Sequence, residues 1–159
     1  PRSSSAASDV YKRQVEKYLN NEDTTKALPH IRQSLENLKP VLDDHIGTIF
    51  GLEVPLYSNH LGVAGRCDCI AQYNGVPSII DFKTSRYKKK KEKISNYFAQ
   101  GAAYSIMWEE RTGMVVPNIV IIMDVDHEKP SVFVEHRDNW TDLLHNTIDE
   151  YRKRKMFGH

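Results

Sequence analysis

The sequence lacks any apolar segment long enough to cross a membrane. Its longest uninterrupted apolar run covers residues 119–123, whereas a membrane helix needs about 20 such residues. The chain does not start with methionine, and no apolar signal-peptide core follows its first residue. We therefore expect an intracellular protein without membrane contact, cytoplasmic if phage or bacterial and organellar if eukaryotic.

Cysteine is nearly absent as well. Cys67 and Cys69 are the only two, too few for a four-cysteine zinc or iron–sulfur site. Side chains alternate between the two faces of a strand, so both thiols should point to one face and Asp68 to the other. We expect two small buried side chains in a reducing compartment.

The motifs of several hydrolase classes are also missing. The chain has no G-x-S-x-G, no glycine-rich phosphate loop and no H-E-x-x-H. Its 40% hydrophobic and 27% charged residues are typical of a globular domain and argue against disorder. A hydrolase that acts on something other than nucleic acid therefore has no support.

The net charge of +1 hides an uneven distribution of basic residues. Residues 83–93 contain seven Lys and Arg and a single acid, and a second basic cluster covers residues 152–155. Such clusters suit a polyanion, although a basic run is more often just a solvated face. Composition alone leaves both interpretations open.

The first fourteen residues differ from the rest. PRSSSAASDVYKRQ is polar, rich in Ser and Ala, and resembles translated adapter sequence from environmental sequencing. We expect residues 1–14 to be a non-native or disordered tail. The predicted domain then covers residues 15–159 and begins inside a helix, without its native start.

Apolar periodicity predicts alternating helices and strands. Spacings of three or four predict helices over residues 15–19, 25–47, 94–111 and from Asp138-Asn139 to about 155, with Pro40 starting a second segment of the longest one. Apolar runs and alternation predict strands over residues 49–57, 63–73, 76–83, 115–124 and 131–136. This order predicts one α/β domain with a mixed central β-sheet flanked by helices.

Asn74-Gly75 separates two of these strands and is a strong hairpin signal, because both central positions of a type I′ turn need positive φ. Asp68 lies six residues before Asn74, and Asp81 lies six after Gly75. The two aspartates should therefore face each other, with Cβ atoms about 4.5–5.5 Å apart. Lys83, two residues beyond Asp81, should share their face.

Two carboxylates this close repel each other unless a cation lies between them. In phosphodiester hydrolysis, carboxylates hold Mg²⁺ or Mn²⁺, the metal activates water, and a lysine orients that water or stabilises charge on the phosphate. We therefore interpret Asp68, Asp81 and Lys83 as catalytic. The alternative is a surface carboxylate pair with a salt-bridging lysine, because a D-x-K triplet alone is weak evidence.

Gln100 and Tyr104 lie four residues apart on the predicted helix after the hairpin, so they share a face. Their amide and phenol could contact phosphate or base edges, or position the lysine. Taken alone, Tyr104 could equally be a half-buried core aromatic.

Three motifs occur in the order of a known nuclease family. Residues 64–68, 80–85 and 100–104 carry G-x-x-D, D-x-K and Q-x-x-x-Y. They resemble the RecB-type branch of the PD-(D/E)XK nuclease superfamily. The similarity extends to its mitochondrial genome maintenance and phage exonucleases through Glu53-x-Pro55-Leu56-Tyr57, and it spans about residues 15–124.

The resemblance implies a restriction-endonuclease-like core and Mg²⁺-dependent DNA cleavage from single-stranded ends, in replication, repair or recombination. Asp68 and Asp81 would bind the metal with the Phe82 carbonyl, and Lys83 would be the catalytic lysine. The residues expected to contact DNA are Arg66, Ser85, Tyr87, Lys88, Lys89, Lys90, Gln100 and Tyr104. An endonuclease on the same core, or a catalytically impaired DNA-binding module, stays open.

One position departs from the family pattern. These nucleases usually carry H-x-x-x-E on the first helix. Glu16 matches the glutamate, so the histidine would fall at Lys12, inside the suspected tail. We expect this chain to lack one metal ligand, with Glu16 and Glu53 as supporting acids, and its cleavage activity to be impaired.

Overall fold

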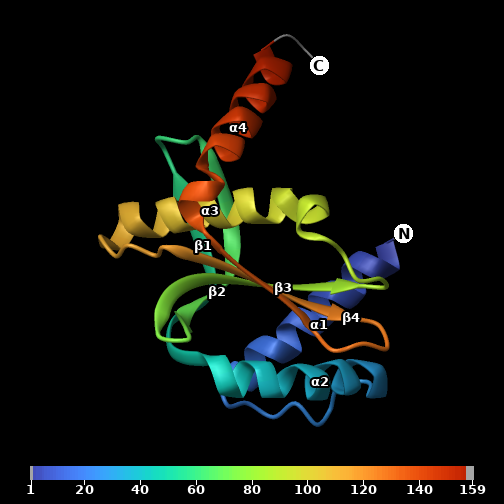
Figure 1. Ribbon diagram of the computed structural model, residues 1–159. Coiled ribbons are helices and arrows are strands. Elements are labelled where there is room, and N and C mark those ends of the chain that lie inside the picture. The colour runs from blue at the N-terminus through green and yellow to red at the C-terminus, as the bar shows by residue number, and fades with distance from the viewer. Residues whose placement is uncertain (1, 157–159) are drawn as a thin grey trace.

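The computed structural model describes residues 2–156, and their side chains from residue 7 onward (Figure 1). The helices are α1 (Arg2–Leu19), α2 (Pro29–His45), α3 (Ser95–Thr112) and α4 (Thr141–Met156). The strands are β1 (Ile46–Ser58), β2 (Val63–Tyr73), β3 (Val76–Ser85), β4 (Asn118–Val125) and β5 (Ser131–His136). Short 3-10 turns, η1 (Lys91–Ile94) and η2 (Arg137–Asn139), precede α3 and α4.

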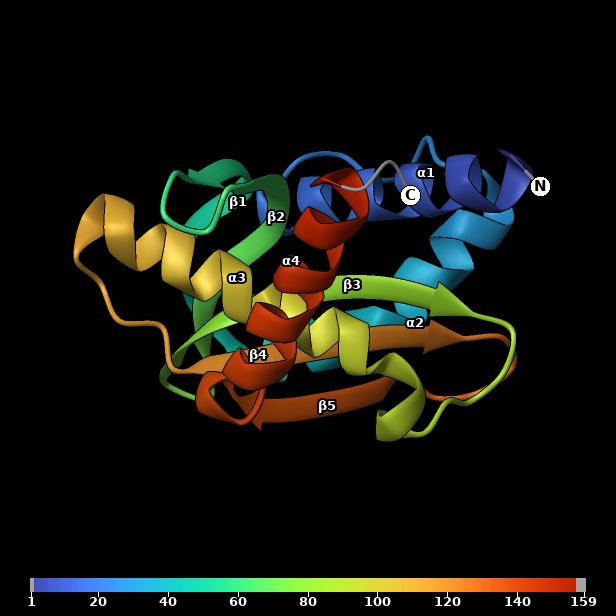
Figure 2. The ribbon, with the colours of Figure 1, turned by 90° about the horizontal axis from the view of Figure 1, so that it is seen from above.

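The strands form one mixed sheet in the order β1-β2-β3-β4-β5. Strands β3 and β4 are parallel, and the other neighbours are antiparallel. Helices α1 and α2 lie on one side of the sheet and α3 on the other, with α4 beyond α3 (Figures 1 and 2). The predicted α/β domain with a mixed central sheet flanked by helices is confirmed. No helix in the described part of the chain combines the length and apolarity needed to cross a membrane.

Each side of the sheet has its own apolar core. On one side, Leu35 of α2 packs in a cluster with Ile80 of β3. On the other, Phe98 of α3 packs in a cluster with Ile121 of β4. Strand β4 is buried from Ile119 onward because both clusters use it, which explains why its sequence is almost continuously apolar.

Helix α1 runs through residues 2–14, where the sequence predicted a non-native or disordered tail. Tyr11 is 1% exposed and lies one helical turn before the buried Val15, so the two side chains continue one apolar face. In the structure, residues 2–14 thus extend the helix that the sequence predicted from residue 15, and the i, i+4 pair of Tyr11 and Val15 is the signal for it. Their non-native origin stays a prediction.

Pro40 does not divide α2, contrary to prediction. The helix is continuous through this residue, and the buried Leu38 and Leu42 lie on either side of it. A proline inside a helix costs about 3 kcal/mol, and the packing of both flanking leucines against the core offsets that cost. The expected second helical segment was therefore wrong.

The two cysteines lie on opposite sides of the sheet. Both are buried, as predicted, but Cys67 belongs to the core under α3 and Cys69 to the core over α2. The prediction that both thiols share a face was wrong. The β2–β3 pairing ends at Cys69, and Glu53 on the other neighbouring strand has a φ of 47°, so β2 does not alternate regularly here.

Gly101 allows α3 to approach the sheet closely. A Cβ atom at this position would lie 2.4 Å from Cγ2 of Ile119, well inside van der Waals contact. Because Ile119 is fully buried in the central strand β4, it has little room to move. The glycine thus determines how near α3, and the side chains it carries, lie to β3.

We predict that Gly101→Ala lowers the free energy of unfolding by about 1–3 kcal/mol, the usual cost of overpacking a core. At an unstrained helical position the same change stabilises by about 1 kcal/mol, so the sign itself is diagnostic. Urea unfolding followed by circular dichroism measures it. Asn96→Ala, at an exposed position of the same helix, is the control and should lose nothing; equal stability of the two variants would contradict the close approach.

Candidate active site

The β2–β3 hairpin has the predicted register. Asn74 and Gly75 adopt φ angles of 51° and 81°, as a type I′ turn requires. Pairing runs from Tyr73–Val76 at the turn to Cys69–Ile80. The next position on each strand holds Asp68 and Asp81, so the two aspartates lie directly beyond the last paired residues.

Where this ladder ends, the side chain of Asp68 takes the place of a backbone hydrogen-bond acceptor. Its Oδ2 accepts a 3.0 Å hydrogen bond from the Phe82 N–H. In a strand, the N–H and C=O of one residue point toward the same neighbouring strand. The Phe82 carbonyl therefore also faces the β2 side, so the end of the ladder gathers a carboxylate and a carbonyl near Asp81.

Lys83 lies beside Asp81, on the face the sequence predicted. Its Nζ is 3.0 Å from Oδ2 of Asp81 and 4.4 Å from the ring centroid of Tyr97 on α3. The ring attracts the ammonium and limits where it can point. Sequence reasoning missed Tyr97, although it precedes Tyr104 by seven residues, a spacing that places both on one helical face.

Lys12 of α1 reaches the same centre. Its Nζ lies 3.3 Å from Oδ2 of Asp68 and 3.6 Å from Oδ1 of Asp81. Lys12, at the position where the family usually has a histidine, thus lies beside both aspartates. The sequence did not predict that this lysine would form ion pairs with them. The ammonium relieves the repulsion between two carboxylates that would otherwise need another cation.

Burial and mutual contact separate the pKa values of the aspartates. Burial, followed by the hydrogen bond and charge of Asp81, raises the pKa of Asp68 to about 8. Burial acts to raise the pKa of Asp81 too, but the hydrogen bond from Asp68 and the charges of Lys83 and Lys12 lower it. Burial opposes the charge of Lys12, yet the carboxylates raise its pKa. The pKa of Asp68 is thus raised and that of Asp81 is lowered, so Asp68 is the weaker acid of the pair.

A second acidic pair lies nearby. Burial, and then the neighbouring Glu53, raises the pKa of Glu16, which places these two side chains in contact between α1 and β1. Nη1 of Arg66 lies 3.8 Å from Oε2 of Glu53. Glu53 has a φ of 47°, which is unusual for a residue other than glycine. The adjoining cleft has a volume of about 590 Å³, and its lining includes Asp9, Lys12, Arg13, Glu53, Arg66 and Asp68.

Tyr104 supports the site from inside the protein. A Cβ on Gly65 would lie 2.8 Å from its Oη, so the glycine of the G-x-x-D motif makes room for this phenol. The Arg66 N–H donates a hydrogen bond to it, and burial is the main cause that raises the pKa of Tyr104 to about 12. Gln100 is exposed, whereas Tyr104 is 7% exposed. Their contacts with DNA stay a prediction.

The loop after β3 starts with a turn held by Ser85. Its Oγ donates to the Tyr87 carbonyl at 2.6 Å and accepts from the Tyr87 N–H at 3.3 Å. Tyr87 is 77% exposed, and the following lysines, Lys88, Lys89 and Lys90, are exposed as well. These side chains are available to a ligand, and their predicted contacts with DNA stay a prediction.

The oxygen donors fit a hard divalent cation, but Lys12 opposes it. Asp68, Asp81 and the Phe82 carbonyl offer the ligand type that Mg²⁺ and Mn²⁺ prefer. Among residues 7–156, no group of three or more His, Cys, Asp or Glu side chains could hold a metal. The ammonium of Lys12 lies against both carboxylates, so a bound metal ion requires that this side chain move aside.

A larger cavity, of about 840 Å³, lies elsewhere. It is bordered by α2 and by the loop between β4 and β5, and its lining includes His30, Gln33, Asn37, Asp124 and His127. It contains none of the three predicted catalytic side chains. Of the three, Asp68 lines the smaller cleft beside α1.

A family profile and two solved structures match this chain. A profile of the PD-(D/E)XK nuclease superfamily matches residues 3–156. A candidate exonuclease from Eubacterium rectale superposes with a TM-score of 0.61 at 14% identity, over 92% of this chain and 65% of that protein. The protein SSO0001 superposes with a TM-score of 0.44 at 16% identity, over 95% of this chain and 74% of its own. The comparison with curated proteins found no match.

The likeness to the Eubacterium rectale protein shows a shared fold. This chain spans about 65% of the length of that protein. The family profile covers nearly the whole sequence. Assignment to the RecB-type branch stays a prediction. The chain belongs to the PD-(D/E)XK nuclease superfamily.

Proposed function

We propose that this chain is a metal-dependent deoxyribonuclease of the exonuclease type, acting on single-stranded ends. The observation that carries the proposal is the convergence of Asp68, Asp81 and Lys83, with Lys83 Nζ 3.0 Å from Asp81 and Asp68 bound to the adjoining Phe82 N–H. A surface ion pair would not need two half-buried carboxylates from paired strands. Such a pair of carboxylates offers oxygen ligands for a metal ion that would serve phosphodiester hydrolysis.

Each residue has a distinct task in the proposed reaction. The carboxylates of Asp68 and Asp81, with the Phe82 carbonyl, would hold Mg²⁺ or Mn²⁺. A divalent cation bound there lowers the pKa of its water and neutralises charge on the phosphate. Lys83, held between Asp81 and Tyr97, orients the attacking water or stabilises charge on the phosphate oxygens.

The finer parts of the proposal rest on the solved structures and on the motifs. The structure from Eubacterium rectale is described as that of a candidate exonuclease, which favours attack at DNA ends for this chain. A role in replication, repair or recombination, and a relationship to phage enzymes, rest on the motif resemblance. An endonuclease on the same core is the alternative within this class.

Lys12 favours a second candidate function, that of a DNA-binding module with impaired cleavage. Its ammonium already neutralises the carboxylates that a metal ion would need. At a separation of about 4 Å and an effective dielectric constant of about 20, two unit charges interact by about 4 kcal/mol. The lysine is thus a strong competitor for any added cation.

We predict that Lys12→His increases the affinity for Mn²⁺ by at least about tenfold, because it removes this competing charge and adds a nitrogen ligand. Isothermal titration calorimetry without DNA measures it. The control Lys17→Ala removes a lysine from the same helix and should leave the affinity unchanged. Adding Asp81→Ala to Lys12→His should abolish the gain. Equal affinity of the wild-type and Lys12→His proteins would contradict the assigned role of Lys12.

In the Lys12→His background, Asp81→Asn and Lys83→Ala should each lower the rate of Mg²⁺-dependent cleavage by about 10²-fold or more. A labelled linear single strand is the substrate, and EDTA should stop the reaction. Binding of the same strand in EDTA should stay within a few-fold of the parent. Near-parental cleavage by either variant would show that the site is assigned wrongly.

Exonuclease action can be separated from endonuclease action with the same protein. We predict that linear single strands are degraded while covalently closed single-stranded circles of the same sequence persist, because a circle offers no end. Gel electrophoresis of the two substrates, incubated together with Mg²⁺, measures this. Cleavage of the circle at a comparable rate would favour the endonuclease instead.

A further inference from the structure

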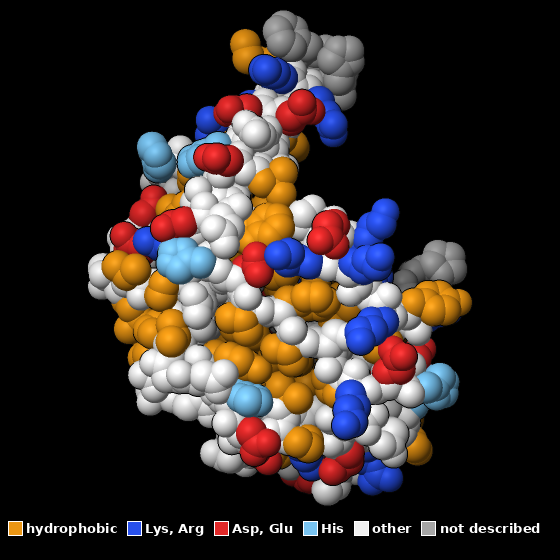
Figure 3. All heavy atoms as spheres, viewed as in Figure 1, with side chains coloured by type: hydrophobic (Ala, Val, Ile, Leu, Met, Phe, Trp, Pro, Cys, Tyr) orange, Lys and Arg blue, Asp and Glu red, His pale blue; other side chains and the backbone are white. Residues whose placement is uncertain are grey.

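A basic groove lies outside the catalytic cleft, at the β5 edge of the sheet. Its volume is about 510 Å³, and we call it the β5 groove. Lys88 and Lys89, from the loop after β3, form one wall, and Lys129, from the loop between β4 and β5, lies on the other. Lys and Arg side chains gather on this side of the molecule, where β3 and β4 end (Figures 1 and 3).

The three lysines of the β5 groove are free to bind an anion. Within residues 7–156, none of them forms an ion pair with a carboxylate, although Glu128 also lines the groove. Lys91, three residues beyond Lys88, differs because it lies 3.7 Å from Glu135 of β5. That contact joins η1 to β5.

The floor of the β5 groove is partly apolar. Phe133 is half-buried and packs edge-on against Phe98 of α3 at 6.3 Å between ring centroids, whereas Val132, 37% exposed, projects from the opposite face of β5. Three lysines without a carboxylate partner thus lie beside a partly exposed aromatic ring. A nucleic-acid strand presents both phosphates and apolar base faces, and it matches this combination.

The sheet connects the β5 groove to the catalytic lysine. Lys83 pairs with Met123 of β4, and Met123 pairs with Ser131 of β5, which lines the groove. Neighbouring strands lie about 4.8 Å apart, so the backbone of Ser131 is about 10 Å from that of Lys83. On α3, the adjacent Tyr97 and Phe98 contact Lys83 and Phe133 respectively.

We propose that the β5 groove is a binding subsite for single-stranded DNA. It holds the DNA a few nucleotides from the phosphodiester bond that is cleaved beside Lys83. Lys88, Lys89 and Lys129 contact successive phosphates, and the partly exposed aromatic ring of the floor contacts the bases. This inference rests on the proposed function, because only a nuclease site would require the DNA strand to run from the groove toward the aspartates. Lys129 and β5 extend the binding surface beyond the residues expected from the motifs.

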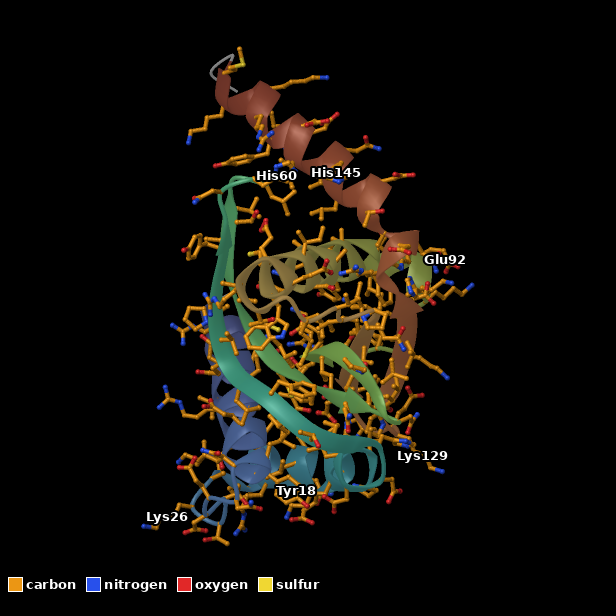
Figure 4. All side chains as sticks on the ribbon, turned by 90° about the vertical axis from the view of Figure 1, so that its left-hand side faces the viewer. Tyr18, Lys26, His60, Glu92, Lys129 and His145 are labelled. Atoms are coloured by element: carbon orange, nitrogen blue, oxygen red, sulfur yellow. The ribbon has the colours of Figure 1, made fainter. Side chains whose placement is uncertain are left out.

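The test is binding of fluorescent oligothymidylates of about 4 to 16 nucleotides, the usual range of single-strand sites, measured by anisotropy in EDTA so that no cleavage occurs. The variant is Lys88→Ala/Lys89→Ala/Lys129→Ala. Its control, Lys17→Ala/Lys26→Ala/Lys39→Ala, removes equal charge near the end of α1, where Lys26 lies far from Lys129 (Figure 4). Circular dichroism checks that both fold.

We expect the groove variant to lose about tenfold in affinity for the longer oligomers at moderate salt, and less for the shortest. The slope of log affinity against log salt should fall by about 2, because each phosphate contact on a single strand contributes about 0.7. The control should match wild type in both. If the two triple variants bind alike, the β5 groove is not a subsite.

Failure of this inference can be distinguished from failure of the proposed function. If the groove variant loses binding but the Lys12→His protein cleaves nothing in Mg²⁺, the subsite stands and the nuclease proposal falls. If Lys12→His cleaves and the added groove substitutions change neither binding nor cleavage, the nuclease stands and the subsite falls.

Discussion

Repulsion between two facing carboxylates is the constraint on which the rest of the site depends. Asp68 and Asp81 occupy opposite positions of a hairpin and are both largely buried, so neither can turn away to solvent. Positive charge must be brought to them. Lys83 comes from β3, the strand that carries Asp81, and Lys12 comes from helix α1.

The scaffold serves this centre by rigidity. A two-residue turn sets the β2–β3 register, and the parallel pairing of β3 with β4 buries the strand that carries Asp81 and Lys83. Two glycines then bring α3 close: Gly101 against β4 and Gly65 beneath Tyr104. Because α3 carries Tyr97, its distance from the sheet also determines where the ammonium of Lys83 can lie.

Local signals made the hairpin predictable. Asn74-Gly75 and the alternation around it determine the register, and from that register the facing aspartates and the position of Lys83 follow by counting. The contacts of Tyr97 and Lys12 depend on how α1 and α3 pack against the sheet, which no short spacing reports. The faces of the two cysteines were predicted wrongly because strict alternation of side chains fails where β2 leaves its partner β3. The predicted first helix was too short because a single apolar pair, Tyr11 and Val15, forms the buried face of its N-terminal part.

The backbone ladder between β2 and β3 stops just before the aspartates, whereas the ladder between β3 and β4 continues past Asp81 and Lys83. A substitution at the centre removes no rung of that ladder. The charge of the centre can therefore change through its side chains while the backbone pairing of the sheet stays the same.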